Sequence, residues 1–379
     1  MHPDSPGIVR AKSSAGPAVI VTRLRLADMR SIQALDWTPA AGINLITGDN
    51  GAGKSTLLEA LHLMAHGRSF RGRVRDGLVR SGADALEVVL DWQAQPSGPG
   101  HRAGLRHSGS QWQARLDGES LRQLGDLCAA LAVTTFEPES HALVSGPADV
   151  RRRYLDWGMF HVEHEFLRLW RRYQRALKQR NALLKQGGST SQLDAWESEL
   201  AGVGEELSAR RRDYVLALQA HVRASLASLL PQADGGELLL APGWREDALA
   251  LGDALLLSRE RDLASGHTSV GPHRADLRLV LPGLPDRSGL SRGQAKTVAL
   301  ALLLGQAAHV REVSGRMPAV ALDDLASELD RSHQRRVLQW LGDCGAQVFV
   351  TGTEPPAMLQ ELAMPVAWFH VEHGQLHPR

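Results

Sequence analysis

The chain has 379 residues, of which 43% are hydrophobic and 22% are charged. These proportions are ordinary for a soluble globular protein and exclude a collagen, a low-complexity disordered chain and a membrane bundle. A single hydrophobic core stops growing at about 250–300 residues, so we expect two packed units. The 43 basic and 42 acidic residues leave a net charge of +1, which excludes a uniformly basic polycation and leaves room only for local basic patches.

Targeting signals and cysteines bear on the compartment. No apolar run reaches the roughly 20 residues that a bilayer-spanning helix needs, and residues 1–17 lack the apolar core of a signal peptide. We expect those seventeen residues to form a disordered tail. Cys128 and Cys344 stand far apart in no metal-binding pattern, as expected for a reducing compartment. The sequence therefore predicts a cytoplasmic protein with no membrane partner.

A phosphate-binding loop is the strongest motif. Residues 19–26 and 43–47 read as strands, and leucines at helical spacing begin at Leu57. Between strand and helix, the pattern G-x-x-x-x-G-K-[ST] is met by Gly48, Asp49, Asn50, Gly51, Ala52, Gly53, Lys54 and Ser55. The glycines let backbone N–H groups surround phosphates, and the helix dipole adds positive potential. We expect ATP here, with Lys54 on the β- and γ-phosphates, Ser55 on Mg²⁺, and Thr56 beside them.

Two long helices are predicted in the middle of the chain. Apolar residues step by three or four from Met159 to Leu177, a glycine break follows at residues 187–189, and the stepping resumes from Leu193 to Leu218. The pattern predicts an antiparallel helical hairpin, followed by a shorter helix-rich stretch to about Ser265, and we call this whole insert the arm. With its leading arginines the hairpin carries a net charge of +6, which favours phosphate contacts modestly over solvated helix faces. His161 and His164 would share a helix face, but no third metal ligand is predicted.

An acidic pair follows a buried strand near the end of the chain. The apolar run Ala319–Leu322 ends at Asp323 and Asp324, where Walker-type sites hold Mg²⁺ and polarise water. We assign Asp323 to the magnesium ion and Asp324 to water activation. About thirty residues earlier, Ser291, Gly293 and Gln294 begin an apolar helix and resemble the signature of ABC-type ATPases. In that family the signature serine caps the γ-phosphate held by another subunit, so the resemblance implies dimerisation around shared ATP.

The length of the insert separates three readings. Ser291 follows Ser55 by 236 residues, which is longer than in an ABC transporter nucleotide-binding subunit and far shorter than in an SMC or Rad50 clamp. A transporter subunit needs a short insert, and a clamp needs an uninterrupted heptad pattern that Pro231 and the glycine pairs break. Both remain alternatives, the clamp ahead of the transporter.

Several short strings resemble the RecF family of bacterial recombination mediators. They are Met29-Arg30-Ser31, Gly67–Arg71, Lys178–Asn181, Thr268–Arg274 and Ser327–Asp330. The resemblance, from about Val19 to Leu376, implies a weak ATPase that binds double-stranded DNA near single-strand gaps and dimerises with ATP. It also implies work with RecR and RecO in loading RecA during DNA damage repair and the SOS response, and association with the nucleoid. It places Arg30 beside the nucleotide.

The expected fold class is α/β: an ABC-type P-loop ATPase lobe assembled from both chain ends, with an inserted α-helical arm lobe. We divide the chain into a tail at 1–17, the first ATPase part at 18–135, the arm lobe at 136–265 and the second ATPase part at 266–379. Two usual ABC residues lack obvious equivalents. Glu137 occupies the place of the Q-loop glutamine, and Thr351 or Thr353 occupies that of the switch histidine.

Overall fold

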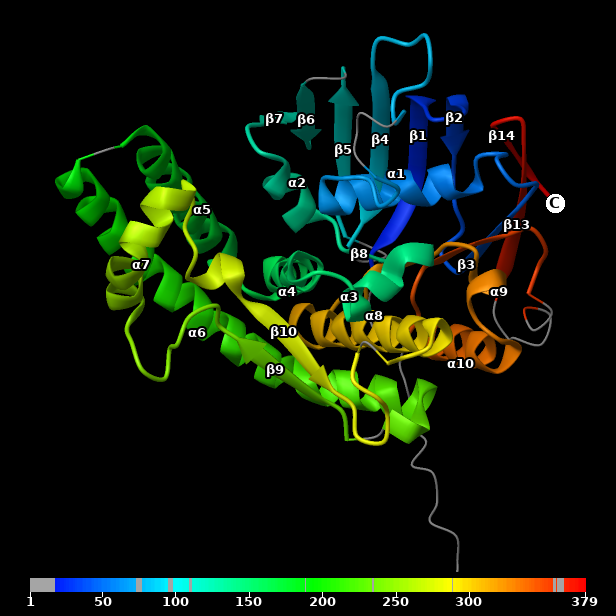
Figure 1. Ribbon diagram of the computed structural model, residues 1–379. Coiled ribbons are helices and arrows are strands. Elements are labelled where there is room, and N and C mark those ends of the chain that lie inside the picture. The colour runs from blue at the N-terminus through cyan, green and yellow to red at the C-terminus, as the bar shows by residue number, and fades with distance from the viewer. Residues whose placement is uncertain are drawn as a thin grey trace, which may run out of the picture.

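The structure is a computed structural model that describes residues 18–72, 77–94, 98–108, 111–187, 189–233, 235–287, 289–356, 359 and 365–379. The predicted tail at 1–17 lies outside the described residues. Two large sheets occupy one part of the molecule, and a group of long helices projects from it on the left of Figure 1. Within the described ranges, none of the helices combines the length and apolarity needed to cross a bilayer.

The first sheet is antiparallel, in the order β2-β1-β4-β5-β6-β7. Buried side chains alternate with less buried ones along β4, as expected when one face of a sheet covers a core. Its strands are β1 (Ile20–Met29), β2 (Ile32–Trp37), β4 (Leu86–Gln93), β5 (Gly100–His107), β6 (Trp112–Leu116) and β7 (Glu119–Leu121).

The second sheet carries the predicted motifs, in the order β14-β13-β3-β12-β11-β8. Five neighbouring strands run parallel and β14 pairs antiparallel at the edge. Every residue of β3, β8, β11 and β12 is buried, as their apolar composition requires when both faces are covered. The strands are β3 (Ile43–Thr47), β8 (Val133–Phe136), β11 (Ala319–Leu322), β12 (Val348–Gly352), β13 (Val366–Glu372) and β14 (Gln375–Pro378).

Helices cover both faces of the second sheet. The motif helix α1 packs between the sheets, touching β4 of the first and β8, β11 and β12 of the second. This accounts for its burial on almost every side. The helices of this part are α1 (Lys54–His66), α2 (Leu124–Ala130), α3 (Ala142–Ser145), α8 (Arg292–Ser314), α9 (Leu325–Glu328) and α10 (Arg331–Asp343), with a 3₁₀ turn η1 (Pro138–His141) before α3.

The arm contains the predicted antiparallel hairpin of α5 and α6, which pack along each other (Figure 1). Its first helix starts later than predicted, because α4 ends at Val162 and a turn at residues 163–165 precedes Phe166. The arm strand β9 pairs antiparallel with β10, apart from both large sheets. The elements are α4 (Ala148–Val162), α5 (Phe166–Gln186), α6 (Thr190–Leu229), η2 (Pro231–Ala233), β9 (Glu237–Ala241), α7 (Leu251–Ser265), η3 (Pro272–Arg274) and β10 (Asp276–Val280).

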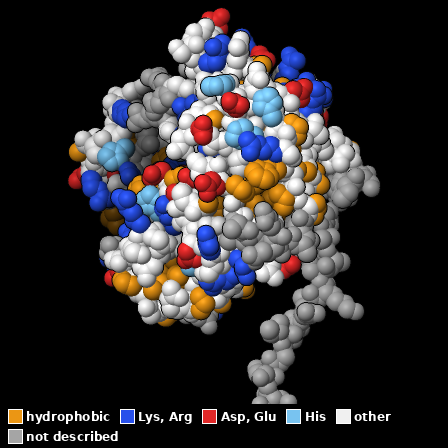
Figure 2. Space-filling model, turned by 90° about the vertical axis from the view of Figure 1, so that its right-hand side faces the viewer, with side chains coloured by type: hydrophobic (Ala, Val, Ile, Leu, Met, Phe, Trp, Pro, Cys, Tyr) orange, Lys and Arg blue, Asp and Glu red, His pale blue; other side chains and the backbone are white. Residues whose placement is uncertain are grey.

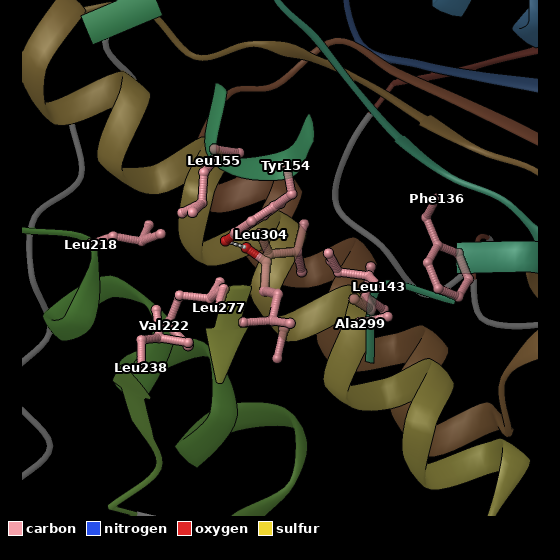
Figure 3. Packing of buried hydrophobic residues seen from close by; sticks show 14 of the residues in the cluster. Phe136, Leu143, Tyr154, Leu155, Leu218, Val222, Leu238, Leu277, Ala299 and Leu304 are labelled. Carbon is pink, nitrogen blue, oxygen red and sulfur yellow. Dashed lines mark hydrogen bonds between the residues drawn. The ribbon is translucent and has the colours of Figure 1, made fainter. Parts of the chain in front are cut away.

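One hydrophobic cluster joins the arm to the ATPase lobe (Figure 3). Leu218 and Val222 of α6 lie in the same cluster as Leu304 of α8. The two helices approach so closely that a Cβ on Gly305 would lie 2.8–3.0 Å from Val222. The Tyr154 hydroxyl of α4 donates a hydrogen bond of 2.7 Å to the Leu302 carbonyl. The arm therefore packs through a continuous hydrophobic core against α8, the helix that follows the signature.

Candidate functional site: a nucleotide cleft at the ends of parallel strands

The loop between β3 and α1 has the backbone that a phosphate cradle needs. Gly48, Gly51 and Gly53 have φ values of 152°, 81° and 114°, in the region where a side chain is strained. At Gly48 a Cβ would also lie 2.3 Å from the Val371 carbonyl oxygen. Glycine at Gly48 is therefore required by both backbone conformation and space.

Lys54, the first residue of α1, folds back over this loop. Its Nζ donates to the carbonyl oxygens of Gly48 at 2.7 Å and Asp49 at 2.9 Å. Burial lowers the pKa of the Lys54 ammonium, and the carboxylates of Asp324, Asp323 and Asp49 oppose that shift. The ammonium thus rests on neutral carbonyls between acidic groups, where a phosphate oxygen can replace them as acceptors.

The acidic pair lies at the end of β11, with Asp323 next to Ser55 of the loop. The Thr351 hydroxyl, on neighbouring β12, donates to Asp323 Oδ1 at 2.7 Å and accepts the Asp324 backbone N–H at 2.9 Å. Burial raises the pKa of the Asp323 carboxyl, while hydrogen bonds from Thr351 and Ser55 oppose the rise. Asp324 has a φ of 53°, and its carboxylate has no hydrogen-bond partner in the described part of the chain. One carboxylate is therefore held rigidly beside Ser55, and the other remains open.

A cleft of about 720 Å³ collects most of the predicted site residues. Its lining includes Asn50, Gly51, Gly53, Lys54, Ser55, Thr56, Arg30, Glu137, Asp323, Asp324 and Thr351. Gly48, Asp49 and Ala52 complete the loop behind it, with the Ala52 N–H donating to Asp49 at 3.2 Å. Thr353, the other candidate for the switch position, is absent from the lining.

Glu137 lies at the cleft wall just after β8. Its Oε2 accepts the Glu139 backbone N–H at 2.6 Å and so caps η1. Burial raises the pKa of Glu137 to about 7, although the backbone hydrogen bond opposes the shift. This carboxyl therefore changes charge near neutral pH, directly after the last residue of β8, the strand that neighbours β11.

The cleft also contains residues that the motif analysis did not assign. Phe70 and Arg71 form part of the wall, as do Ser31 and Glu139. Phe70 and Arg71 belong to a string already noted for its family resemblance, but spacing alone does not show where such a segment folds. Their position in a string shared with known ATPases was the available signal.

The signature residues lie away from the cleft. Ser291, Gly293 and Gln294 are absent from its lining, and Ser291 and Gly293 are exposed. The Ser291 hydroxyl accepts the Gln294 N–H at 3.2 Å, and the Gln294 side chain accepts the Ser291 N–H at 2.9 Å. This is a capping box at the start of the 23-residue helix α8. A single chain therefore presents its phosphate loop and its signature as separate surfaces.

The arginine runs of the arm are largely neutralised by carboxylates. Of the eight arginines at 151–153, 171–172 and 210–212, seven form ion pairs and Arg152 donates to the Ala275 carbonyl. On the face that carries β13 and β14, acidic and basic side chains are also interspersed (Figure 2). Exposed ion pairs are worth about 0–1 kcal/mol and can exchange partners. The surplus of basic residues does not by itself mark a phosphate-binding surface.

The histidine pair on the arm does not form a metal site. His161 is on α4, but the helix ends before His164, so they do not share a helix face. Among the described residues, no group of three or more histidine, cysteine, aspartate or glutamate side chains is arranged to hold a metal ion.

Comparisons with known proteins agree with this architecture. The family model for the RecF/RecN/SMC N terminal domain matches residues 20–377. The chain is 60% identical over 359 residues to the DNA replication and repair protein RecF of Stenotrophomonas maltophilia, covering 94% of this chain and 98% of that protein. It is 39% identical over 360 residues to the RecF protein of Thioalkalivibrio sulfidiphilus, covering 94% and 99% respectively.

Solved structures give the same result at the level of the fold. A structure of the recombination mediator protein RecF with ATP in the RecFOR pathway superposes with a TM-score of 0.84 at 25% identity, covering 97% of this chain and all of that one. An SMC head domain from Pyrococcus furiosus reaches a TM-score of 0.56 at 15% identity, covering 95% and 96%, and shows the fold alone.

Two sheets around a P-loop helix, with an inserted helical arm, define an ABC-type ATPase head of the kind shared by RecF and SMC proteins. The α/β fold class predicted from the sequence is confirmed. Within that class, the chain belongs to the RecF family of DNA replication and repair proteins.

Proposed function

We propose that this chain binds ATP with Mg²⁺ in the cleft and uses it to dimerise on DNA. The observation that carries the proposal is the meeting of Lys54, Ser55 and Asp323 in one cleft, with Asp323 already held by Thr351. Gly48 to Thr56 would hold the phosphates, Ser55 and Asp323 would hold the magnesium ion, and Asp324 would orient the attacking water. Arg30 would contact the nucleotide from the opposite wall.

The separation of the signature from the cleft supports a shared site. Ser291, Gly293 and Gln294 would complete the ATP site of a second copy, with the Ser291 hydroxyl and the start of α8 directed at its γ-phosphate. In this role the Ser291 hydroxyl would donate a hydrogen bond to the partner's γ-phosphate while still accepting the Gln294 N–H that caps α8. Hydrolysis would be slow and would release the dimer.

By family membership, we propose a role in recombinational repair at gapped DNA. The homodimer would bind double-stranded DNA near a single-strand gap and, with RecR and RecO, help load RecA. The proposed division of the chain follows the one expected from the sequence, with two changes. We place η1 and α3 with the ATPase lobe because they pack against α8, and η3 and β10 with the arm because β10 pairs with β9. The length of the arm also favours this role over an SMC-like clamp, which needs a far longer insert. The longest arm helix, α6, has 40 residues, is about 60 Å long and ends at Leu229.

A mixing experiment tests the shared site. Ser291→Arg should keep ATP binding in the monomer and lose ATP-dependent dimerisation, because a long charged side chain would occupy the partner's phosphate site. Lys54→Met should lose ATP binding. Together the two variants can rebuild one intact site of two. The mixture should therefore recover part of the ATP-dependent association, measured by sedimentation, and about half or less of the wild-type ATP turnover, measured by a hydrolysis assay. Normal hydrolysis by Ser291→Arg alone, or no recovery from two folded variants, would exclude the shared arrangement.

A second experiment tests the DNA proposal. Sedimentation with and without ATP, on gapped and on plain duplex DNA, should show a dimer bound to DNA only with ATP and a preference for the gapped form. Equal binding with and without ATP would contradict the proposed coupling.

A further inference from the structure

A fully buried carboxylate lies one helical turn beyond the proposed magnesium ligand. Glu59 is on α1 four residues after Ser55, in a helix otherwise rich in leucine, and it is 0% exposed. A buried carboxylate without partners is strongly disfavoured, so its neighbours must hold it. Nothing in the phosphate-loop motif requires an acidic residue at this position.

Both oxygens of Glu59 are engaged by side chains from two other segments. Arg30, in the turn between β1 and β2, donates from Nη2 to Oε1 at 2.7 Å and from Nε to Oε2 at 3.1 Å. The Ser69 hydroxyl, just beyond α1, also donates to Oε1. The Arg30 and Glu59 side chains are 17% and 0% exposed, so water competes little for this pair.

Both of these segments contribute to the lining of the cleft. Arg30 lines the cleft and has a φ of 55°, a conformation that an L-residue rarely adopts without support. Ser69 is linked onward, because its hydroxyl accepts the Arg71 backbone N–H at 2.9 Å. Phe70 and Arg71 line the cleft as well. One carboxylate therefore ties the motif helix to both of these lining segments.

We infer that Glu59 is a positioning residue for nucleotide binding, which acts by holding the Arg30 guanidinium in the cleft and by fixing the Phe70-Arg71 segment through Ser69. The inference rests on the proposed function, since it needs ATP to occupy the cleft. Glu59 lies outside the phosphate-loop motif. In this role it would position the cleft residues that the loop itself does not supply. A bidentate contact suits this task because it fixes both the place and the plane of the guanidinium.

A double-mutant cycle tests the inference on the full-length chain. ATP affinity is measured by calorimetry for the wild type, Glu59→Gln, Arg30→Ala and the combination. Glu59→Gln keeps the shape and removes the charge, and should weaken ATP binding about tenfold, or about 1.4 kcal/mol. In the Arg30→Ala background the same change should weaken ATP binding no more than Ser69→Ala does, because only the link through Ser69 is then left. Ser69→Ala should weaken binding less than Glu59→Gln.

The matched control is another buried ion pair far from the cleft. Asp262→Asn in the arm removes a carboxylate that is 0% exposed and bound to Arg180. It should lower the melting temperature and leave ATP affinity unchanged. The inference is overturned if Glu59→Gln, like this control, lowers the melting temperature but leaves ATP affinity unchanged. It is also overturned if the losses of ATP affinity in Glu59→Gln and Arg30→Ala are independent, so that their fold-changes multiply in the double variant.

The outcomes separate this inference from the proposed function. A folded wild type that does not bind ATP would overturn both. A wild type that binds ATP, together with an unaffected Glu59→Gln, would overturn only the role of Glu59. If Glu59→Gln does not fold, Ser69→Ala carries the test, and ATP affinity unchanged in that variant would also overturn it.

Discussion

The nucleotide cleft and the arm use charged residues in opposite ways. In the cleft, Lys54 rests on carbonyl oxygens and the Asp324 carboxylate has no hydrogen-bond partner in the described chain. In the arm, Arg180 is 0% exposed and is bound to both Glu197 and Asp262. This buried arginine of the arm is neutralised within the chain, whereas the cleft keeps Lys54 and Asp324 ready for a ligand. Charge density in a sequence therefore locates function only after pairing within the chain is known.

The largest effect should come from removing the lysine of the cleft. Lys54→Ala should weaken ATP binding by about 3–6 kcal/mol, since it deletes hydrogen bonds from a charged donor to two phosphates at about 1.5–3 kcal/mol each. ATP-dependent dimerisation and DNA binding should disappear with it. Calorimetry and sedimentation measure these losses, with Lys185→Ala in the arm as the matched control. If Lys54→Ala still dimerises with ATP, Lys54 is not needed to bind ATP and the proposed contrast between cleft and arm is wrong.

The arm should respond in stability and not in ligand binding. Arg180→Leu leaves the buried Asp262 carboxylate without its cation, although Glu197 keeps Arg259, and should lower the free energy of unfolding by about 3–5 kcal/mol. Urea unfolding measures this loss, and the ATP affinity of the folded variant should stay at the wild-type value. The exposed pair of Arg172 and Glu199 supplies the control, because Arg172→Leu should cost about 1 kcal/mol or less. Equal costs for the two arginines would show that burial does not matter here.

The acidic pair should divide binding from hydrolysis. Asp324→Asn should slow ATP turnover by about 10²–10³-fold because the group that orients water is lost, while ATP still binds and the dimer persists. Asp323→Asn should instead weaken binding of Mg-ATP. Steady-state hydrolysis and nucleotide affinity, measured on both variants, distinguish them. If both variants lose Mg-ATP binding equally, the assigned division of roles is wrong.

The smallest effect concerns pH. Because the pKa of Glu137 is about 7 in the folded chain and near 4.5 when unfolded, the folded chain holds the extra proton between those values. Stability from this group is therefore present at low pH and falls as pH rises through that window, by about 1 kcal/mol after allowance for solvent screening. Unfolding of the wild type and Glu137→Gln from pH 5 to 8 measures it. If the difference in free energy of unfolding between the wild type and Glu137→Gln does not change with pH, Glu137 does not titrate in this range.

Predictions from the sequence succeeded where the signal is local. The strand Ile43–Thr47, the phosphate loop and the strand Ala319–Leu322 lie where the pattern placed them. The start of α5 was missed, because Met159, Val162 and Phe166 keep a spacing of three or four across a turn that interrupts the helix. Periodicity reports which side chains face the core, and a short turn need not disturb it.

The class of ATPase, the phosphate loop, the acidic pair and the presence of an arm could be predicted, since each depends on adjacent residues or on their spacing. Which distant groups meet in the cleft depends instead on how the chain folds. Thr351 holds Asp323 because β11 and β12 are parallel neighbours, and Arg30 reaches Glu59 because α1 packs against the first sheet. The arm arginines are paired for the same reason: ion pairs depend on distances in the folded chain, which composition does not contain.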